Sequence, residues 1–331
     1  MLGDYTAPQE DENIKTVLDG VISKLSPSKV EYVRGCAIRD TTVNEIAEVV
    51  EAASRSEVII AVVGGSSARA FKTSYQETGA AIADEKSISD MECGEGFDRA
   101  TLTLLGKQQD LLNALKATGK PLIVVYIEGR PLDKVWASEY ADALLTASYP
   151  GQEGGYAIAD VLFGDYNPAG RLPVSVPRSV GQIPVYYNKK APCNHDYVEQ
   201  AASPLYTFGY GLSYTTFEYS DLQVMRKSPC YFEVSFKVKN TGSYDGEEVA
   251  QLYLRDEYAS VVQPLRQLKC FQRFFLKRGE EKEIFFTLTE KDLSIIDRNM
   301  ARVVETGDFR IMIGASSDDI RLTKDISVES L

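Results

Sequence analysis

The carboxylates of one glycine-containing stretch are the side chains best suited to chemistry in this sequence. Glu95 stands between two glycines (G-E-G), and Glu92 precedes it by three positions. Flanking glycines let the backbone adopt positive φ and approach a ligand closely. On its own, such a pattern fits a solvated turn as well as a general acid, and both interpretations stay open here. Asp98 and Arg99 are predicted to be structural, with an acid that starts the next helix and a guanidinium that clamps the loop.

The other residue types give little support for different kinds of catalysis. His195 is the only histidine, and no G-x-S-x-G motif accompanies it, so a Ser-His-Asp triad is not expected. The five cysteines are scattered and form no C-x-x-C motif, which argues against a structural zinc site and a disulfide framework. We therefore expect no metal and no cofactor, and assign acid–base chemistry to carboxylates. His195 is expected in a surface loop.

Charge and hydropathy exclude further classes of protein. The 331 residues include 36 Lys and Arg against 48 Asp and Glu, which gives a formal net charge of −12. A nucleic-acid-binding protein would need clustered basic residues instead. No apolar run approaches the ~20 residues that cross a bilayer, and the first residues show neither a basic start nor the apolar segment of an export signal. We expect a soluble protein of two domains that binds neither nucleic acid nor membrane.

The first part of the sequence alternates apolar runs with segments of helical period. Nearly all-apolar runs that end at glycine or proline are predicted as buried parallel strands, at Val58–Val63, Pro121–Ile127 and Ala143–Tyr149, with Val30–Cys36 as a further candidate. Helices are predicted over Asn44–Ser54, capped by Thr41 or Thr42, and over Leu104–Ala117 and Tyr156–Phe163. This alternation predicts an α/β open sandwich, with a mostly parallel sheet and helices on both faces.

The period changes to two after residue 217. Short alternating strands are predicted at Tyr231–Lys239, Val249–Leu254, Lys269–Leu276, Glu283–Leu288 and Phe309–Ile313. Strands at this spacing without helices predict an all-β, fibronectin III-like sandwich. The stretch between the α/β part and the all-β part is rich in Gly, Pro and aromatic residues, so we expect an ordered connector. The predicted domains are 1–180 (α/β), 181–216 (connector) and 217–331 (β-sandwich).

Ligands of open α/β sheets bind beyond the carboxyl ends of the strands, which directs attention to the loops there. The strand predicted at Val58–Val63 is followed by G-G-S-S-A at Gly64–Ala68. In a nucleotide-binding protein, this segment would have to hold the phosphates. It matches neither G-x-G-x-x-G nor a P-loop, so nucleotide binding is the least favoured function. The long polar insert from Arg69 to Arg99, which contains Glu95, follows the same strand.

Three long motifs resemble the C-terminal half of glycoside hydrolase family 3, which contains β-glucosidases and β-xylosidases. They are I-S-D-M-E-C-G-E-G-F-D-R, then S-Y-P-G-Q-E-G-G-Y-A-I-A-D-V-L-F-G-D-Y-N-P-A-G-R-L-P-V-S-V-P, and P-L-Y-T-F-G-Y-G-L-S-Y-T-T-F-E-Y. In the last part, N-T-G and G-E-E-V-A-Q-L-Y-L are similar to the family's fibronectin III-like domain. The resemblance covers nearly the whole chain.

This resemblance implies a retaining glycosidase whose two carboxyls come from different domains. The α/β domain would supply the acid/base, which falls on Glu95, with Glu92 as the fallback, and an N-terminal (β/α) barrel would supply an aspartate nucleophile. A barrel needs about 250 residues, and far fewer precede the first predicted strand. The family's S-D-W nucleophile motif is absent, and the chain starts at the L-G-D-Y that follows the family's first strand. We therefore expect a truncated, inactive polypeptide with an exposed sheet edge.

The favoured function is thus the C-terminal part of an exo-acting β-glycosidase that hydrolyses terminal β-linked sugars of oligosaccharides. Its partner would be the missing barrel, in cis or in trans. The alternative is a non-catalytic carbohydrate-binding or partner module that pairs with a separate barrel chain. The motifs V-Y-Y-N-K-K and S-P-L-Y-T-F-G-Y-G lean slightly towards β-xylosidases. The choice between glucose and xylose, the substrate-binding residues and the native compartment are left open.

Overall fold

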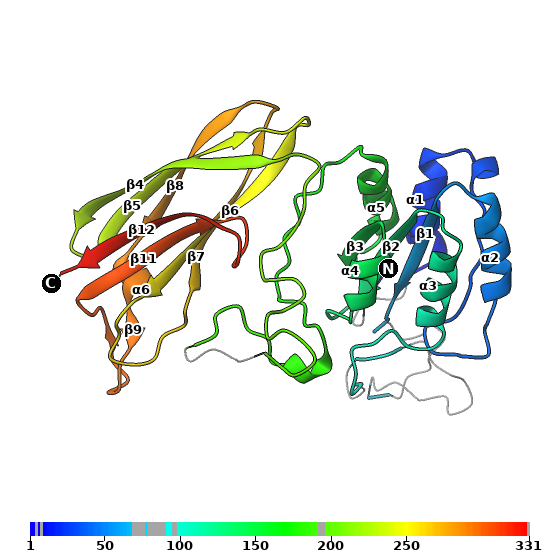
Figure 1. Ribbon diagram of the computed structural model, residues 1–331, viewed down its shortest axis with the longest axis horizontal. Helices are drawn as coiled ribbons and strands as arrows, with labels where there is room; N and C mark the ends of the chain where they lie inside the picture. Colours follow the sequence, from blue (N-terminus) through cyan, green and yellow to red (C-terminus); the bar gives the residue numbers. More distant parts are fainter. Residues whose placement is uncertain are drawn as a thin grey trace. The chain divides into compact units, whose positions relative to one another are not determined.

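Two compact units make up the part of the chain that the structure describes, namely residues 1–3, 6, 9–67, 77–78, 91–94, 98–190 and 196–329 of a computed structural model. The first unit comprises Met1–Tyr166 and Arg178–Gly181, and the second comprises Asn167–Pro177 and Gln182–Leu331 (Figure 1). Most of the segment 181–216 therefore groups with the second unit. Each unit has its own sheets and its own core.

A parallel sheet of three strands lies at the centre of the first unit, in the order β1-β2-β3. The strands are β1 (Ile59–Gly64), β2 (Leu122–Glu128) and β3 (Ala143–Ser148). Val62 pairs with Val125, which in turn pairs with Leu145. All three predicted strands are confirmed, with each end within one residue of its predicted position. They are apolar along their whole length because helices cover both faces of the sheet.

In the described part of this unit, five α-helices flank the sheet (Figure 1). They are α1 (Val17–Lys24), α2 (Ile46–Arg55), α3 (Gln108–Ala117), α4 (Val135–Tyr140) and α5 (Gly154–Phe163). On one face, α2, α3 and α4 pack on the sheet through residues such as Ala53, Leu112 and Ala137. On the other face, α1 and α5 do so through Val21 and Ile158. The predicted α/β sandwich with helices on both faces is therefore confirmed.

Helix α1, which was not predicted from the sequence, is held at its start by a capping box. The backbone N–H of Thr16 donates to Asp19 Oδ2 at 2.8 Å, and the backbone N–H of Asp19 donates back to Thr16 Oγ1 at 3.2 Å. This arrangement satisfies N–H groups that have no partner inside the helix. A Cβ on Gly20 would collide with the carbonyl oxygen of Gly155 on α5. Glycine at position 20 thus permits the close packing of the two helices.

Several predicted boundaries in the first unit are wrong. Val30–Cys36 forms no strand, because Gly35 has a φ of +79° and interrupts the extended run, leaving only an isolated bridge at Cys36. Helix α2 has Glu45 at its N-cap, so neither Thr41 nor Thr42 caps it. Helix α3 starts at Gln108, four residues later than predicted, because Gly106 has a φ of +60°.

The second unit is built from two antiparallel sheets. One has the order β12-β11-β6-β7, the other has the order β4-β5-β8, and a small ribbon pairs β10 with β9. Their bounds are β4 (Phe217–Ser228), β5 (Tyr231–Asn240), β6 (Gly246–Asp256), β7 (Gln267–Leu276), β8 (Glu281–Leu288), β9 (Ile295–Ile296), β10 (Arg302–Val303), β11 (Gly307–Gly314) and β12 (Ile320–Val328), with α6 (Glu290–Leu293) after β8. The predicted all-β, fibronectin III-like sandwich is confirmed; β4, β9, β10 and β12 are additional to the predicted strands, and the short helix α6 was not expected.

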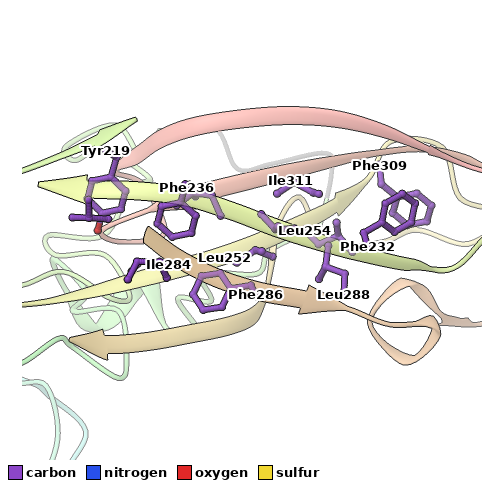
Figure 2. Close-up of a cluster of buried hydrophobic side chains, with 14 of the residues drawn as sticks. Tyr219, Phe232, Phe236, Leu252, Leu254, Ile284, Phe286, Leu288, Phe309 and Ile311 are labelled. Carbon is purple, nitrogen blue, oxygen red and sulfur yellow. The ribbon is translucent and has the colours of Figure 1, made fainter. Parts of the chain in front are cut away.

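One continuous apolar core joins the two sheets of this unit (Figure 2). The alternating residues of β5 supply its centre, because every second side chain of a strand points to the same face. Phe236 is fully buried between Tyr219 and Phe286, with ring centroids 6.0 and 5.7 Å apart. Leu252 of β6 and Ile311 of β11 complete the opposite side.

Polar side chains and aromatic rings order the segment that precedes β4. Asn167 Oδ1 accepts hydrogen bonds from Ser213 Oγ and from the backbone N–H of Tyr214, both at 2.8 Å. The ring of Tyr187 stacks on Phe208 with centroids 4.2 Å apart. These contacts account for the many aromatic residues of this segment by packing within the second unit.

Candidate active site

The three parallel strands of the first unit end at the same edge of the sheet, and polar residues follow there. At the end of β1, the backbone N–H of Gly64 donates to Gln108 Oε1 at 2.7 Å, and the Gly64 carbonyl accepts from Gln108 Nε2 at 2.9 Å. Glu128 is the last residue of β2, and Tyr149 follows β3. Since ligands of open α/β sheets bind beyond this edge, it is the candidate active site.

The residues on both sides of the G-E-G motif are anchored at this edge. On one side, the backbone N–H of Glu92 donates to the carbonyl of Ser66, just beyond β1, at 2.7 Å. On the other side, Asp98 forms an ion pair of 2.7 Å with Arg130, just beyond β2. Glu95 itself lies outside the described residues. Its assignment as acid/base therefore stays a prediction, and the structure supplies the position of the segments that precede and follow it.

A buried ion pair joins these two segments. Arg99 Nη1 donates to Glu92 Oε2, and Arg99 Nη2 donates to the backbone carbonyl of Thr103. The side chains of Glu92 and Arg99 are 0% and 7% exposed. Because the Glu92 carboxylate is enclosed and paired with a guanidinium, it suits a structural role better than proton donation. The predicted clamp by Arg99 is confirmed, whereas Asp98 begins no helix.

A second buried ion pair, between Glu128 and Lys134, lies at the end of β2. Lys134 Nζ donates to both carboxylate oxygens of Glu128, at 2.6 and 2.7 Å, and the backbone N–H of Leu132 donates to Glu128 Oε2 at 3.1 Å. Burial raises the pKa of Glu128 and lowers the pKa of Lys134, while each partner opposes that shift. This pair was not predicted from the sequence. The signal that could have found it is a glutamate that ends an otherwise apolar strand, with a lysine six residues later.

The carboxylate of Glu92 also bears on the nucleotide-binding alternative. A Cβ on Gly65 would collide with the Glu92 carboxylate, so this acid lies directly against the backbone after β1. A nucleotide phosphate would need the position that the Glu92 carboxylate already occupies. The segment Gly64–Ser67 is thus a poor phosphate cradle, and Ala68 lies outside the described residues.

The described residues offer no other obvious centre for chemistry in the first unit. They contain no group of three or more His, Cys, Asp or Glu side chains that could hold a metal ion. None of the helices in the described ranges combines the length and the apolar character needed to cross a membrane. His195, which is expected in a surface loop, lies outside the described residues.

Comparison with known proteins assigns both units to families. Residues 1–214 match the glycosyl hydrolase family 3 C-terminal domain, and residues 248–317 match the fibronectin type III-like domain. A β-xylosidase of Formosa agariphila is 40% identical over 92% of this chain and 40% of its own length. A periplasmic β-glucosidase of Salmonella typhimurium is 42% identical over 83% of this chain and 35% of its own length.

Solved structures agree with these matches. A β-glucosidase from Erythrobacter marinus superposes with a TM-score of 0.84 at 34% identity, covering 98% of this chain and 44% of that protein. A β-glucosidase from Listeria innocua, solved in complex with isofagomine, has a TM-score of 0.84 at 29% identity, covering 98% and 44%. The chain thus spans about two fifths of the length of these relatives. It belongs to glycoside hydrolase family 3, and it carries that family's C-terminal α/β domain followed by a fibronectin III-like domain.

Proposed function

We propose that the chain is the C-terminal part of a retaining, exo-acting β-glycosidase and that Glu95 is its acid/base residue. The single observation that carries this proposal is the anchoring of both segments beside Glu95 at the carboxyl edge of the sheet, through Glu92 on one side and Asp98 on the other. The family match and the β-glucosidase and β-xylosidase relatives support the reaction class.

The proposed reaction takes place in two steps. In the first step, a carboxylate nucleophile attacks the anomeric carbon while Glu95 donates its proton to the departing glycosidic oxygen. In the second step, Glu95 takes a proton from water, which then hydrolyses the glycosyl–enzyme bond. The nucleophile is proposed to come from a (β/α) barrel, in cis or in trans, and to lie about 5–5.5 Å from Glu95.

The charged pairs described at this edge do not by themselves keep Glu95 protonated. The Glu92–Arg99, Asp98–Arg130 and Glu128–Lys134 pairs each join one acid with one base, so the edge carries little net charge. A general acid has to stay protonated near the working pH, which burial or a nearby negative charge can achieve. We propose that docking of the barrel supplies both, through burial of Glu95 and through the charge of the nucleophile.

Reconstitution tests the need for a barrel. The chain alone is expected to show little or no turnover of aryl β-glucosides and β-xylosides, and mixing with a separately expressed family 3 barrel is expected to restore it. The ratio of the two restored rates identifies the preferred sugar. Turnover by the pure chain at the rate of a complete family 3 enzyme would disprove the requirement. Carbohydrate binding without restored turnover would favour the non-catalytic module instead.

A leaving-group series tests Glu95 itself in the reconstituted enzyme. Glu95→Gln should lower kcat/KM about 10²–10⁴-fold for substrates with poor leaving groups, because these need a proton. Dinitrophenyl glycosides need no proton for departure and should lose far less in the first step. Added azide should replace water in the second step and yield a glycosyl azide. The matched control is Glu153→Gln, an exposed glutamate in the same unit, which should leave both profiles unchanged.

An equal loss for all leaving groups after Glu95→Gln would contradict the acid/base role. Glu92→Gln then distinguishes the fallback from a structural residue. Since Glu92 is enclosed and paired with Arg99, its substitution should lower thermal stability without a leaving-group dependence.

A further inference from the structure

The loop that follows β2 is held in shape by the buried ion pair at its two ends. Glu128 ends β2, and Lys134 directly precedes α4. Between them, the backbone N–H of Leu132 donates to Glu128 Oε2, and Lys134 Nζ donates to the Leu132 carbonyl, both at 3.1 Å. All three residues are buried. The side chain of Arg130, which lies in this loop, therefore projects from a fixed backbone.

The guanidinium group of Arg130 reaches residues on both sides of Glu95. Its Nη2 forms an ion pair of 2.7 Å with Asp98 Oδ1. The same guanidinium interacts with the thiol of Cys93, a residue that is 6% exposed. Burial lowers the pKa of Arg130, but the hydrogen bonds to Asp98 and Cys93 outweigh this effect and raise the pKa overall, so the group stays charged. One side chain thus joins the two residues that flank the segment 94–97.

Two connections of different burial therefore join the chain before Glu95 to the chain after it. The Glu92–Arg99 pair connects the residues that lie one position further from Glu95 on each side, and it is enclosed. The side chains of Asp98 and Arg130 are 70% and 28% exposed. Breaking an enclosed pair strongly destabilises a fold, whereas an exposed pair adds little to stability. The Arg130 contacts thus restrain the segment without contributing much to the stability of the unit.

Glu95 needs contacts from outside its own segment to keep one position. It stands between two glycines, whose backbone has more conformational freedom than that of other residues. A general acid must lie within hydrogen-bond reach of the oxygen that it protonates. A misplacement of about 1 Å can lower the rate about 10²-fold. The residues beside Glu95 do not restrict its position, so the side chain that joins the two ends of the segment has to do so.

We propose that Arg130 is a positioning residue for the acid/base: it ties Cys93 to Asp98 and thereby holds the Glu95 carboxyl group within reach of the glycosidic oxygen. This inference rests on the proposed acid/base role of Glu95. Arg130 acts through Glu95 and does not itself exchange a proton with the substrate. The ion pair between residues 128 and 134 contributes by fixing the loop from which Arg130 projects.

Hydrogen exchange of the whole chain, measured by NMR without a barrel, tests whether Arg130 restrains the segment. Arg130→Met removes both contacts, so the amides of Gly94 and Phe97 should exchange on the order of tenfold faster, while the unfolding temperature stays nearly unchanged. Arg130→Lys keeps the charge but loses the planar fork that reaches two partners, so its exchange should be intermediate. Unchanged exchange of both amides in Arg130→Met overturns the proposal, whatever role Glu95 has.

Kinetics of the chain reconstituted with a family 3 barrel test whether Arg130 acts through Glu95. Arg130→Met should lower kcat/KM about tenfold to hundredfold for substrates with poor leaving groups, and far less for dinitrophenyl glycosides. In the Glu95→Gln background, Arg130→Met should cause no further loss, because residues that act as one unit are not additive. The matched control is Arg55→Met, which breaks an exposed ion pair with Glu31 in the same unit and should leave exchange and kinetics unchanged.

The kinetic outcomes separate this inference from the proposed function. If Glu95→Gln shows the leaving-group dependence and Arg130→Met does not, Glu95 remains the acid/base and Arg130 is not its positioning residue. If the two losses multiply in the double variant, Arg130 acts independently of Glu95 and the inference is overturned. An equal loss for all leaving groups after Glu95→Gln overturns the proposed function and, with it, this inference.

Discussion

The two units differ in where their buried ion pairs lie relative to the apolar core. In the first unit, the Glu92–Arg99 and Glu128–Lys134 pairs are buried at the edge where the strands end, beyond the apolar sheet. In the second unit, one apolar core lies between the two sheets, and the buried Arg171–Glu248 pair joins the segment before β4 to the start of β6. Removing charges from water costs free energy that their attraction only partly returns. Buried charge therefore contributes to the position of side chains, while apolar burial supplies stability.

The largest expected effect is on the sandwich core. Phe236→Ala removes a fully buried ring between Tyr219 and Phe286, so it should lower the free energy of unfolding of the second unit by about 3–5 kcal/mol. Chemical denaturation followed by circular dichroism measures this loss. Trp136, the only tryptophan, lies on α4 of the first unit, so its fluorescence transition should not move.

Phe285→Ala is the matched control, because Phe285 lies next to Phe286 on β8 but is 63% exposed. Its substitution should change the free energy of unfolding by less than about 0.5 kcal/mol. Equal losses from Phe236→Ala and Phe285→Ala would show that the core of Figure 2 does not carry the stability of this unit.

A smaller effect is expected when one buried charge of the first unit loses its partner. Lys134→Met leaves the Glu128 carboxylate buried and unpaired, which should lower the free energy of unfolding by about 3 kcal/mol at neutral pH. Trp136 fluorescence follows the loss. The double variant Glu128→Gln/Lys134→Met should regain most of it, because no unpaired charge remains. A double variant as unstable as the single one would contradict the view that this pair adds little net stability.

The same single variant has a defined pH dependence. Burial already raises the pKa of Glu128 in the folded chain, and the loss of Lys134 removes the charge that opposes this shift. A carboxyl whose folded pKa exceeds its unfolded pKa binds more protons when folded, so stability rises as the pH falls through that window. The loss caused by Lys134→Met should therefore shrink in acid, and a loss that grows in acid would contradict this assignment.

The smallest expected effect concerns the capping boxes, of which the described part of each unit contains one. Thr16→Ala at α1 should cost about 1 kcal/mol in the Trp136 transition, and Thr289→Ala at α6 about 1 kcal/mol in the circular-dichroism transition. Hydrogen bonds from Thr16 lower the pKa of Asp19 in the folded chain. That contribution is present above the unfolded pKa of about 4 and is lost as the pH falls through the folded value. The cost of Thr16→Ala should thus decrease in acid. A cost that does not change with pH would show that Asp19 does not contribute to the stability of this cap.

Sequence periodicity predicted the elements whose own residues decide their conformation. β2 and β5 are long enough, and either apolar throughout or strictly alternating, so their type and position agree with the structure. Helix α4, with six residues, is too short to show a helical period, and it was missed. Val30–Cys36 has the composition of a strand, yet Gly35 turns the chain there. In these segments, tertiary contacts and single backbone angles outweigh local preference.

Local properties of the chain, its periodicity and its motifs, were enough to identify the family, the two kinds of sheet and the glycine-flanked Glu95 as the candidate acid. The packing of distant segments, in contrast, encloses Glu92 with Arg99, brings Lys134 to Glu128, and pairs Arg171 with Glu248. Burial and pairing depend on which segments meet in three dimensions, and these two conditions decide whether a charged side chain stabilises the fold or is left to bind a ligand.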